Sequence, residues 1–203
     1  GGSAIEAEGT ALSGFTLEVC RKSDAVLLGA VGDPRYDKPD NDIRPEDGLL
    51  AIRKGLGLFA NIRPVKVYQE LENNTRFKPE AIRSTDFVFV RELTGGVYFG
   101  KPKRRWETTR GRRAVDSMVY SEQEIARIVR VGFELARQRK KQLVSVDKAN
   151  VLMSSRLWRQ VADEVAKEYP DVTLEHLLVD ACAMKLVQDP RYVDVVVTEN
   201  MFG

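Results

Sequence analysis

The chain has 203 residues, of which 43% are hydrophobic and 31% are charged. This balance is typical of soluble globular domains and excludes disordered, collagen-like and disulfide-stapled chains. The net charge of +2 at pH 7 gives no bulk attraction for nucleic acid, so we expect no nucleic-acid partner. Cys20 and Cys182 lie far apart without metal-ligand spacing, which indicates a reducing, cytoplasmic setting. The apolar runs are shorter than the roughly 20 residues of a membrane helix, so we expect no membrane association.

Apolar, β-branched runs recur along the chain and predict strands. Several are continuous enough to be covered on both faces of a sheet. Helical patterns lie between them, and strands that alternate with helices predict an α/β fold. The predicted strands span residues 24–31, 86–90, 142–146, 172–178 and 193–197.

Three helices are predicted in the second half of the chain. Residues 122–140 place apolar side chains on one helical face, and Ser121 with Glu124 forms a capping-box pattern. A second helix begins at Ser154 or Ser155 and ends near Tyr169, before a proline. A third helix begins at Asp180 and continues to about residue 187.

Gly55 and Gly57 match a dinucleotide-binding fingerprint when they are read with Ala60. That fingerprint works between a strand and the start of a helix, where free amides meet a pyrophosphate. Here a helix-like segment, 46–54, precedes the glycines. We therefore interpret the two glycines as the end of that helix.

Two segments contain few apolar residues. Residues 32–46 predict a long loop, and long loops in compact domains are often functional. Residues 101–113 contain seven basic residues and one acidic residue. This segment suits either a phosphate or nucleic-acid patch or a projecting hairpin, and we favour the hairpin because Trp106 is its only aromatic residue.

Arg53, Arg63 and Arg91 each lie beside a strand or turn signal. A guanidinium group binds a carboxylate through two parallel hydrogen bonds, so converging arginines would suit a di- or tricarboxylate. Taken singly, each arginine also fits a surface ion pair. The spacing alone leaves both interpretations open.

Four other side chains are candidates for chemistry. Tyr98 follows a Gly-rich turn, where it either caps a hairpin or donates a proton beside a cation. Lys148 follows a buried strand, at the edge where open α/β sheets bind ligands, and suits a base. Asp180 also follows a strand and suits a helix N-cap, a ligand for a hard cation, or both. His176 lies within a strand and is interpreted as structural.

Six ordered segments resemble the isopropylmalate branch of the β-decarboxylating dehydrogenases, which also include isocitrate, homoisocitrate and tartrate dehydrogenases. The resemblance spans essentially the whole chain but only a central part of the family's length. It rests on residues 44–54, 58–64, 90–100, 145–152, 179–184 and 198–203.

The resemblance implies a two-domain α/β fold with a mixed sheet flanked by helices, incomplete here at both ends. Residues 1–58 would be part of a split cofactor-binding domain. Residues 59–203 would be most of a dimer-forming domain for substrate and metal, with a projecting arm at 101–118.

The resemblance also implies a reaction, the NAD-dependent oxidative decarboxylation of 3-isopropylmalate to 4-methyl-2-oxopentanoate in leucine biosynthesis. Arg53, Arg63 and Arg91 would bind the malate carboxylates. Tyr98 would protonate the enol after CO₂ leaves. Lys148, supplied by the partner subunit of a homodimer with shared active sites, would help to remove the hydroxyl proton.

Cofactor and specificity residues follow from the same resemblance. Asp180, also supplied across the dimer, would bind Mg²⁺ or Mn²⁺. Glu46, Leu49 and Leu50 correspond to the family's specificity segment, in which Glu46 would contact the cofactor and the leucines would face the isopropyl group. Contacts with one alkyl group discriminate weakly between substrates that differ by a methylene group, so other 3-alkylmalates are also expected to react.

The family continues beyond the final motif into an Asp-rich helix that completes the metal site and into segments that hold NAD. We therefore expect the 203-residue chain alone to be inactive. Two alternatives remain open at this stage. One is a non-catalytic dimerising module, and the other is a related 3-alkylmalate, tartrate or homoisocitrate dehydrogenase.

Overall fold

A computed structural model describes residues 1–38 and 41–203. The chain forms two compact units, Gly1–Phe59 and Ala60–Gly203. The division lies one residue beyond the boundary expected at residue 58. The assignment of the first unit to a cofactor-binding domain stays a prediction. None of the described helices has the length and apolar character needed to cross a membrane.

The first unit is helical in its described residues. It contains α1 (Gly2–Glu8), α2 (Gly14–Arg21), the 3₁₀ helix η1 (Pro34–Tyr36) and α3 (Pro45–Gly55). Gly48 faces the carbonyl oxygen of Ala11 so closely that a Cβ atom would collide with it. After α3, Gly57 adopts a left-handed φ of 66° and its amide donates to the Lys54 carbonyl at 3.1 Å. The interpretation of the glycines as a helix end is confirmed.

The strand predicted over residues 24–31 is wrong, because these residues have irregular backbone. Leu27 is 99% exposed. A strand is stable only when a neighbouring strand takes up its backbone hydrogen bonds, and the described residues of the first unit contain no strand. The loop predicted over 32–46 contains η1 and the start of α3; its residues 39 and 40 lie outside the described ranges.

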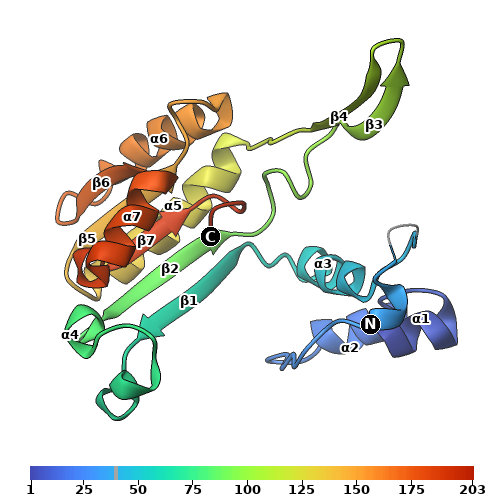
Figure 1. Ribbon diagram of the computed structural model, residues 1–203, viewed down its shortest axis with the longest axis horizontal. Coiled ribbons are helices and arrows are strands. Elements are labelled where there is room, and N and C mark those ends of the chain that lie inside the picture. The colour runs from blue at the N-terminus through green and yellow to red at the C-terminus, as the bar shows by residue number, and fades with distance from the viewer. Residues whose placement is uncertain (39–40) are drawn as a thin grey trace. The chain divides into compact units, whose positions relative to one another are not determined.

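The second unit is built on a five-stranded sheet of order β1-β2-β7-β5-β6 (Figure 1). Strand β1 is antiparallel to β2, whereas β2, β7, β5 and β6 run parallel to one another. The predicted α/β fold with a mixed sheet is confirmed. The strands are β1 (Ala60–Lys66), β2 (Asp86–Glu92), β5 (Gln142–Asp147), β6 (Thr173–Leu178) and β7 (Val195–Thr198).

Helices cover both faces of this sheet. Alternate residues of β5 point to opposite faces: the Ser145 hydroxyl accepts from Trp158 of α6 at 3.0 Å, while Val144 and Val146 pack with Cys182 of α7. Helices α5 and α6 therefore lie on one face and α7 on the other. The helices of this unit are α4 (Pro79–Ile82), α5 (Glu122–Arg137), α6 (Met153–Ala166) and α7 (Val179–Gln188), with 3₁₀ turns η2 (Gln69–Asn74) and η3 (Pro190–Tyr192).

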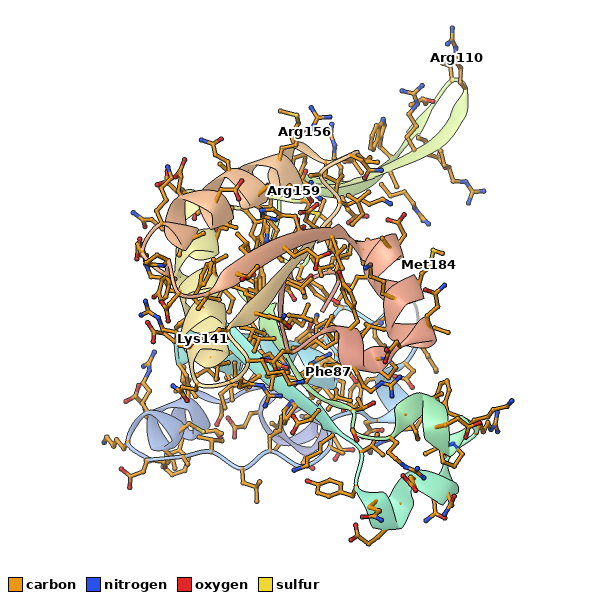
Figure 2. All side chains as sticks on the ribbon, turned by 90° about the vertical axis from the view of Figure 1, so that its left-hand side faces the viewer. Phe87, Arg110, Lys141, Arg156, Arg159 and Met184 are labelled. Atoms are coloured by element: carbon orange, nitrogen blue, oxygen red, sulfur yellow. The ribbon has the colours of Figure 1, made fainter. Side chains whose placement is uncertain are left out.

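The basic segment forms a two-stranded hairpin of β3 (Lys103–Thr108) and β4 (Gly111–Asp116). It extends away from the sheet, with Arg110 at its tip (Figures 1 and 2). The hairpin interpretation of this segment is confirmed. Its role as a dimer arm stays a prediction.

Helix starts in the second unit follow two patterns. At α5 the predicted capping box forms: the Ser121 hydroxyl accepts from the Glu124 amide at 3.3 Å, and the Glu124 carboxylate accepts from the Ser121 amide at 2.8 Å. The predicted serine cap of α6 is wrong, because α6 begins at Met153 and Leu152 occupies the cap position. Asp180 likewise lies in the first turn of α7 and not at its cap.

We predict that Ser121→Ala lowers the free energy of unfolding by about 1 kcal/mol, because the Glu124 amide at the start of α5 loses the hydroxyl oxygen that caps it. Ser154→Ala is the matched control, since Ser154 provides no side-chain cap for α6. Urea unfolding followed by circular dichroism measures both variants. Equal destabilisation by the two substitutions would contradict the capping assignment.

Candidate active site

The carboxyl ends of β2, β7, β5 and β6 meet at one edge of the sheet, because these strands are parallel. Arg91 is the second-to-last residue of β2, and Lys148 directly follows β5. Asp180 follows β6, in the first turn of α7. Open α/β sheets bind their ligands at this edge. The structure thus brings three of the predicted site residues to one edge.

Arg91 and Tyr98 lie next to each other. The guanidinium carbon of Arg91 is 5.5 Å from the centre of the Tyr98 ring. Arg91 also donates to the Asn200 side-chain oxygen, from Nε at 3.1 Å and from Nη2 at 3.0 Å. Tyr98 is 47% exposed. This arrangement provides a cation beside an accessible phenol, as the proton-donor interpretation of Tyr98 requires.

A buried carboxylate shapes the turn that leads to Tyr98. Glu92 is fully buried and accepts hydrogen bonds from the amides of Thr94 and Gly95, at 2.7 and 2.8 Å. The next residue, Gly96, has a left-handed φ of 78°. Glu92 is not among the site residues predicted from the sequence. Its position between an apolar strand and a Thr-Gly-Gly turn is the sequence feature that indicates its role.

Arg63 shares a face of the sheet with Arg91. Asn61 pairs with Arg91 across β1 and β2, and Arg63 pairs with Phe89. Because side chains two residues apart in a strand point to the same face, these four side chains lie on one face. Arg63 is exposed, and its Nε donates to the Asn61 side-chain oxygen at 2.7 Å.

Lys148 and Asp180 form an ion pair. The Lys148 ammonium donates to Oδ1 of Asp180 at 2.5 Å. This hydrogen bond is the main reason that the pKa of Asp180 lies below its ordinary value. Solvent reaches the ion pair, because Asp180 is exposed and Lys148 is only partly buried.

Asp180 alone does not make a metal site. In the part of the chain that the structure describes, no three His, Cys, Asp or Glu side chains lie close enough together to hold an ion. Hard divalent cations take six or more oxygen ligands, some of them from water. Asp180 can supply one carboxylate to such an ion.

The main chain around Lys148 is held by buried polar side chains. Asp147 is fully buried; its Oδ1 accepts from the Ala149 amide at 2.7 Å and its Oδ2 from Nε of Arg159 at 2.6 Å. Arg159 belongs to α6 (Figure 2). The hydroxyl of Ser155 accepts from the Lys148 amide at 3.1 Å. Ser155 is therefore engaged with β5, which explains why it does not cap α6.

Glu199 lies behind these residues and is fully buried. Its Oε1 accepts from the Ser155 hydroxyl at 2.5 Å, whereas its Oε2 has no hydrogen-bond partner in the described part of the chain. Burial raises the pKa of Glu199 to about 7, and the nearby negative charge of Asp147 contributes to the increase. Neither Ser155 nor Glu199 is among the site residues predicted from the sequence.

In the first unit, α3 carries four predicted site residues on one face. Glu46, Leu49, Leu50 and Arg53 are spaced three, four and seven residues from the first, which aligns them along a helix. Glu46 is exposed and the two leucines are partly buried. The helix thus presents a carboxylate, an apolar surface and a guanidinium group in succession.

His176 stays outside this arrangement. Its Nε2 lies 2.9 Å from Oδ1 of Asp163 on α6. The ring links strand β6 to a helix, in agreement with a structural role.

Comparison with protein families matches residues 1–203 to the model described as isocitrate/isopropylmalate dehydrogenase. The chain belongs to this family. The predicted resemblance is confirmed over the entire sequence.

Curated relatives support the isopropylmalate branch. The chain is 69% identical over 204 residues to a 3-isopropylmalate dehydrogenase from Dehalococcoides mccartyi, covering 100% of this chain and 56% of that protein. It is 59% identical over 203 residues to the Geobacillus kaustophilus 3-isopropylmalate dehydrogenase, covering 100% and 55%. The chain therefore spans about half the length of these relatives.

Solved structures share the fold. A crystal structure of isocitrate dehydrogenase from Methylococcus capsulatus matches with a TM-score of 0.76 and 30% identity, over 100% of this chain and 56% of that one. A β-decarboxylating dehydrogenase from Thermococcus kodakarensis matches with a TM-score of 0.72 and 31% identity, over 99% and 53%.

We predict that stability falls as pH rises through the titration range of Glu199. Its folded pKa, about 7, lies above the unfolded value, 4.5, so the folded chain binds the extra proton between these limits. The free energy of unfolding contributed by Glu199 is complete below about pH 4.5 and is lost as pH passes 7, a change on the order of 3 kcal/mol.

Urea unfolding at about pH 5 and about pH 8 measures this change. Glu199→Gln should remove most of the loss, because the amide cannot ionise. Glu164→Gln, at an exposed carboxyl on α6, is the control and should keep the wild-type pH dependence. If Glu199→Gln and wild type show the same dependence, Glu199 does not carry a proton in the fold.

Proposed function

We propose that the whole protein is an NAD-dependent 3-isopropylmalate dehydrogenase of leucine biosynthesis. It would oxidise the 2-hydroxyl group of 3-isopropylmalate and release CO₂, giving 4-methyl-2-oxopentanoate. The observation that carries the proposal is the placement of Arg91 beside Tyr98 at the carboxyl end of β2, in a chain 69% identical to a 3-isopropylmalate dehydrogenase.

The substrate's two carboxylates would be bound by arginines. Arg63 and Arg91 lie on the same sheet face of the second unit, and Arg53 comes from α3 of the first unit. Each guanidinium group can hold a carboxylate through two parallel hydrogen bonds. Leu49 and Leu50, on the same helix as Arg53, would form the apolar wall for the isopropyl group.

Specificity and cofactor contact would both come from α3. Removing a methylene-sized contact costs about 1–3 kcal/mol, so the two leucines would favour isopropylmalate without excluding other 3-alkylmalates. Glu46 lies one turn before the leucines and would contact the cofactor. Bound NAD would supply a hydride acceptor, and Asp180 would contribute one carboxylate to a Mg²⁺ or Mn²⁺ ion, which would supply a Lewis acid for the hydroxyl group of the substrate.

Two side chains of this protein would move the protons. Lys148 would take the proton of the 2-hydroxyl group as the carbonyl forms. Its ammonium is bound to Asp180 here, so it must first release a proton of its own. After CO₂ leaves, the Tyr98 hydroxyl would protonate the carbon that carried the carboxylate, and the Arg91 cation beside the ring would stabilise the resulting phenolate.

A homodimer with shared active sites fits the grouping of these residues. Lys148 contacts Asp180, and Arg91 contacts Tyr98, so the candidates fall into two pairs. Each active site would combine the Arg91 pair of one chain with the Lys148 pair of its partner. Helix α7 also exposes apolar side chains that suit contact with a second copy: Met184, 63% exposed (Figure 2), and Val187, 74% exposed. We propose a cytoplasmic location, where Cys20 and Cys182 stay reduced.

Lys148→Ala in the whole protein tests the reaction. We predict that kcat falls about 100- to 10,000-fold, the usual contribution of a positioned proton-transfer group, while the dimer stays intact. NADH formation from 3-isopropylmalate with Mn²⁺ measures kcat, and light scattering measures the mass. Lys167→Ala, at an exposed lysine after α6, is the control.

Two results would contradict the proposal. Wild-type turnover by Lys148→Ala would remove this residue from the mechanism. Absence of NADH formation by the wild-type protein would overturn the proposed reaction itself.

A further inference from the structure

A buried line of hydrogen bonds runs from the end of β7 to the main chain at Lys148. The carboxyl group of Glu199 accepts from the Ser155 hydroxyl at 2.5 Å. The same hydroxyl oxygen accepts from the Lys148 amide at 3.1 Å. Glu199 and Ser155 are both fully buried, so no solvent competes for these bonds. These two hydrogen bonds join the residues that directly follow β7 and β5 to a serine of α6.

The two buried carboxyl groups near Lys148 have different partners. Asp147 accepts from the Arg159 guanidinium at 2.6 Å and from the Ala149 amide at 2.7 Å, which suits an ionised carboxylate. Among the residues that the structure describes, Glu199 has no cationic partner and its Oε2 has no hydrogen-bond partner. An unpaired buried charge is costly, so Glu199 is best accommodated with a proton on Oε2. Different environments thus give the two acids different charges.

We propose that Glu199 is a positioning residue: through Ser155 it fixes the main chain at Lys148 and so places the ammonium group that contacts Asp180. The catalytic consequence rests on the proposed function, in which Lys148 transfers a proton. The positioning itself rests only on the contacts described above.

Ionisation of Glu199 would disturb this support. The charged and titratable groups around Glu199 are Asp147 of β5, Arg159 of α6, which neutralises Asp147, and Tyr120 before α5. The Tyr120 hydroxyl accepts from the amide of Asn200, the residue after Glu199, at 2.8 Å. A negative Glu199 would repel Asp147, which holds the amide of Ala149. The backbone amides of Lys148 and Ala149 would therefore both be affected by the charge of Glu199.

The test labels the lysines of the whole protein with ¹³C-methyl groups, which keeps their charge, and follows the Lys148 resonance by NMR. Lys148→Arg assigns that resonance. In the wild type we expect its position to change with pH, with a midpoint near 7. Glu199→Gln keeps the size of the side chain and should abolish this midpoint. Ser155→Ala should shift the resonance and abolish the midpoint, while Ser154→Ala, at the adjacent residue, should do neither.

Kinetics provide a second readout. We expect Ser155→Ala to lower kcat on the order of tenfold, because a misplaced catalytic group loses its alignment. KM for 3-isopropylmalate should stay unchanged, since the proposed carboxylate ligands are arginines on other elements. Glu199→Gln should make kcat less dependent on pH between about 6 and 8.

The inference is overturned if the Lys148 resonance changes with pH in the same way in the wild type and in Glu199→Gln, or if Ser155→Ala leaves both the resonance and kcat unchanged. If Ser155→Ala does not fold, the NMR comparison of Glu199→Gln with the wild type tests the positioning role of Glu199. A wild-type protein without activity on 3-isopropylmalate would overturn the proposed function instead, and the NMR comparison would still decide the positioning role.

Discussion

Parallel hydrogen bonding among β2, β7, β5 and β6 is the constraint on which the candidate site depends. Parallel strands direct all their carboxyl ends to one edge, so residues far apart in sequence follow one another there. Arg91, Lys148 and Glu199 each lie at or just beyond the end of such a strand. An antiparallel neighbour in their place would have put one of these groups at the opposite edge.

Buried carboxyl groups hold this edge in place. Glu92 accepts amides of the turn before Tyr98, and Asp147 accepts an amide beside Lys148. Each hydrogen bond offsets part of the free-energy cost of burying the carboxylate. The same bonds hold the backbone next to a reactive side chain in one preferred geometry. Glu199 differs because it lacks a cation, and it is therefore the acid in this group suited to hold a proton near neutrality. Packing, electrostatics and the proposed chemistry are coupled through these three side chains.

The sequence predicted features that depend on local pattern. The apolar runs of β2, β5, β6 and β7 and the Ser121 capping box were predictable because each is encoded by neighbouring residues. The strand predicted at 24–31 failed because strand formation also needs a partner strand, which local pattern does not reveal. Ser155 was interpreted as a possible helix cap, and Glu199 was not predicted as a site residue, because burial and contacts between elements are fixed only by the tertiary fold. The grouping of Arg91 with Tyr98 was plausible from proximity in sequence, whereas the contact of Lys148 with Asp180 joins residues that follow two different strands, β5 and β6.

Mixed dimers test the central claim that each active site combines residues of two chains. Whole proteins carrying Arg91→Ala or Lys148→Ala are each expected to be nearly inactive. After unfolding and refolding together in equal amounts, the mixture should recover about one quarter of wild-type activity, because half of the dimers contain one intact site. Activity that stays at the level of the separate variants, in a mixture shown by mass spectrometry to contain mixed dimers, would contradict the claim.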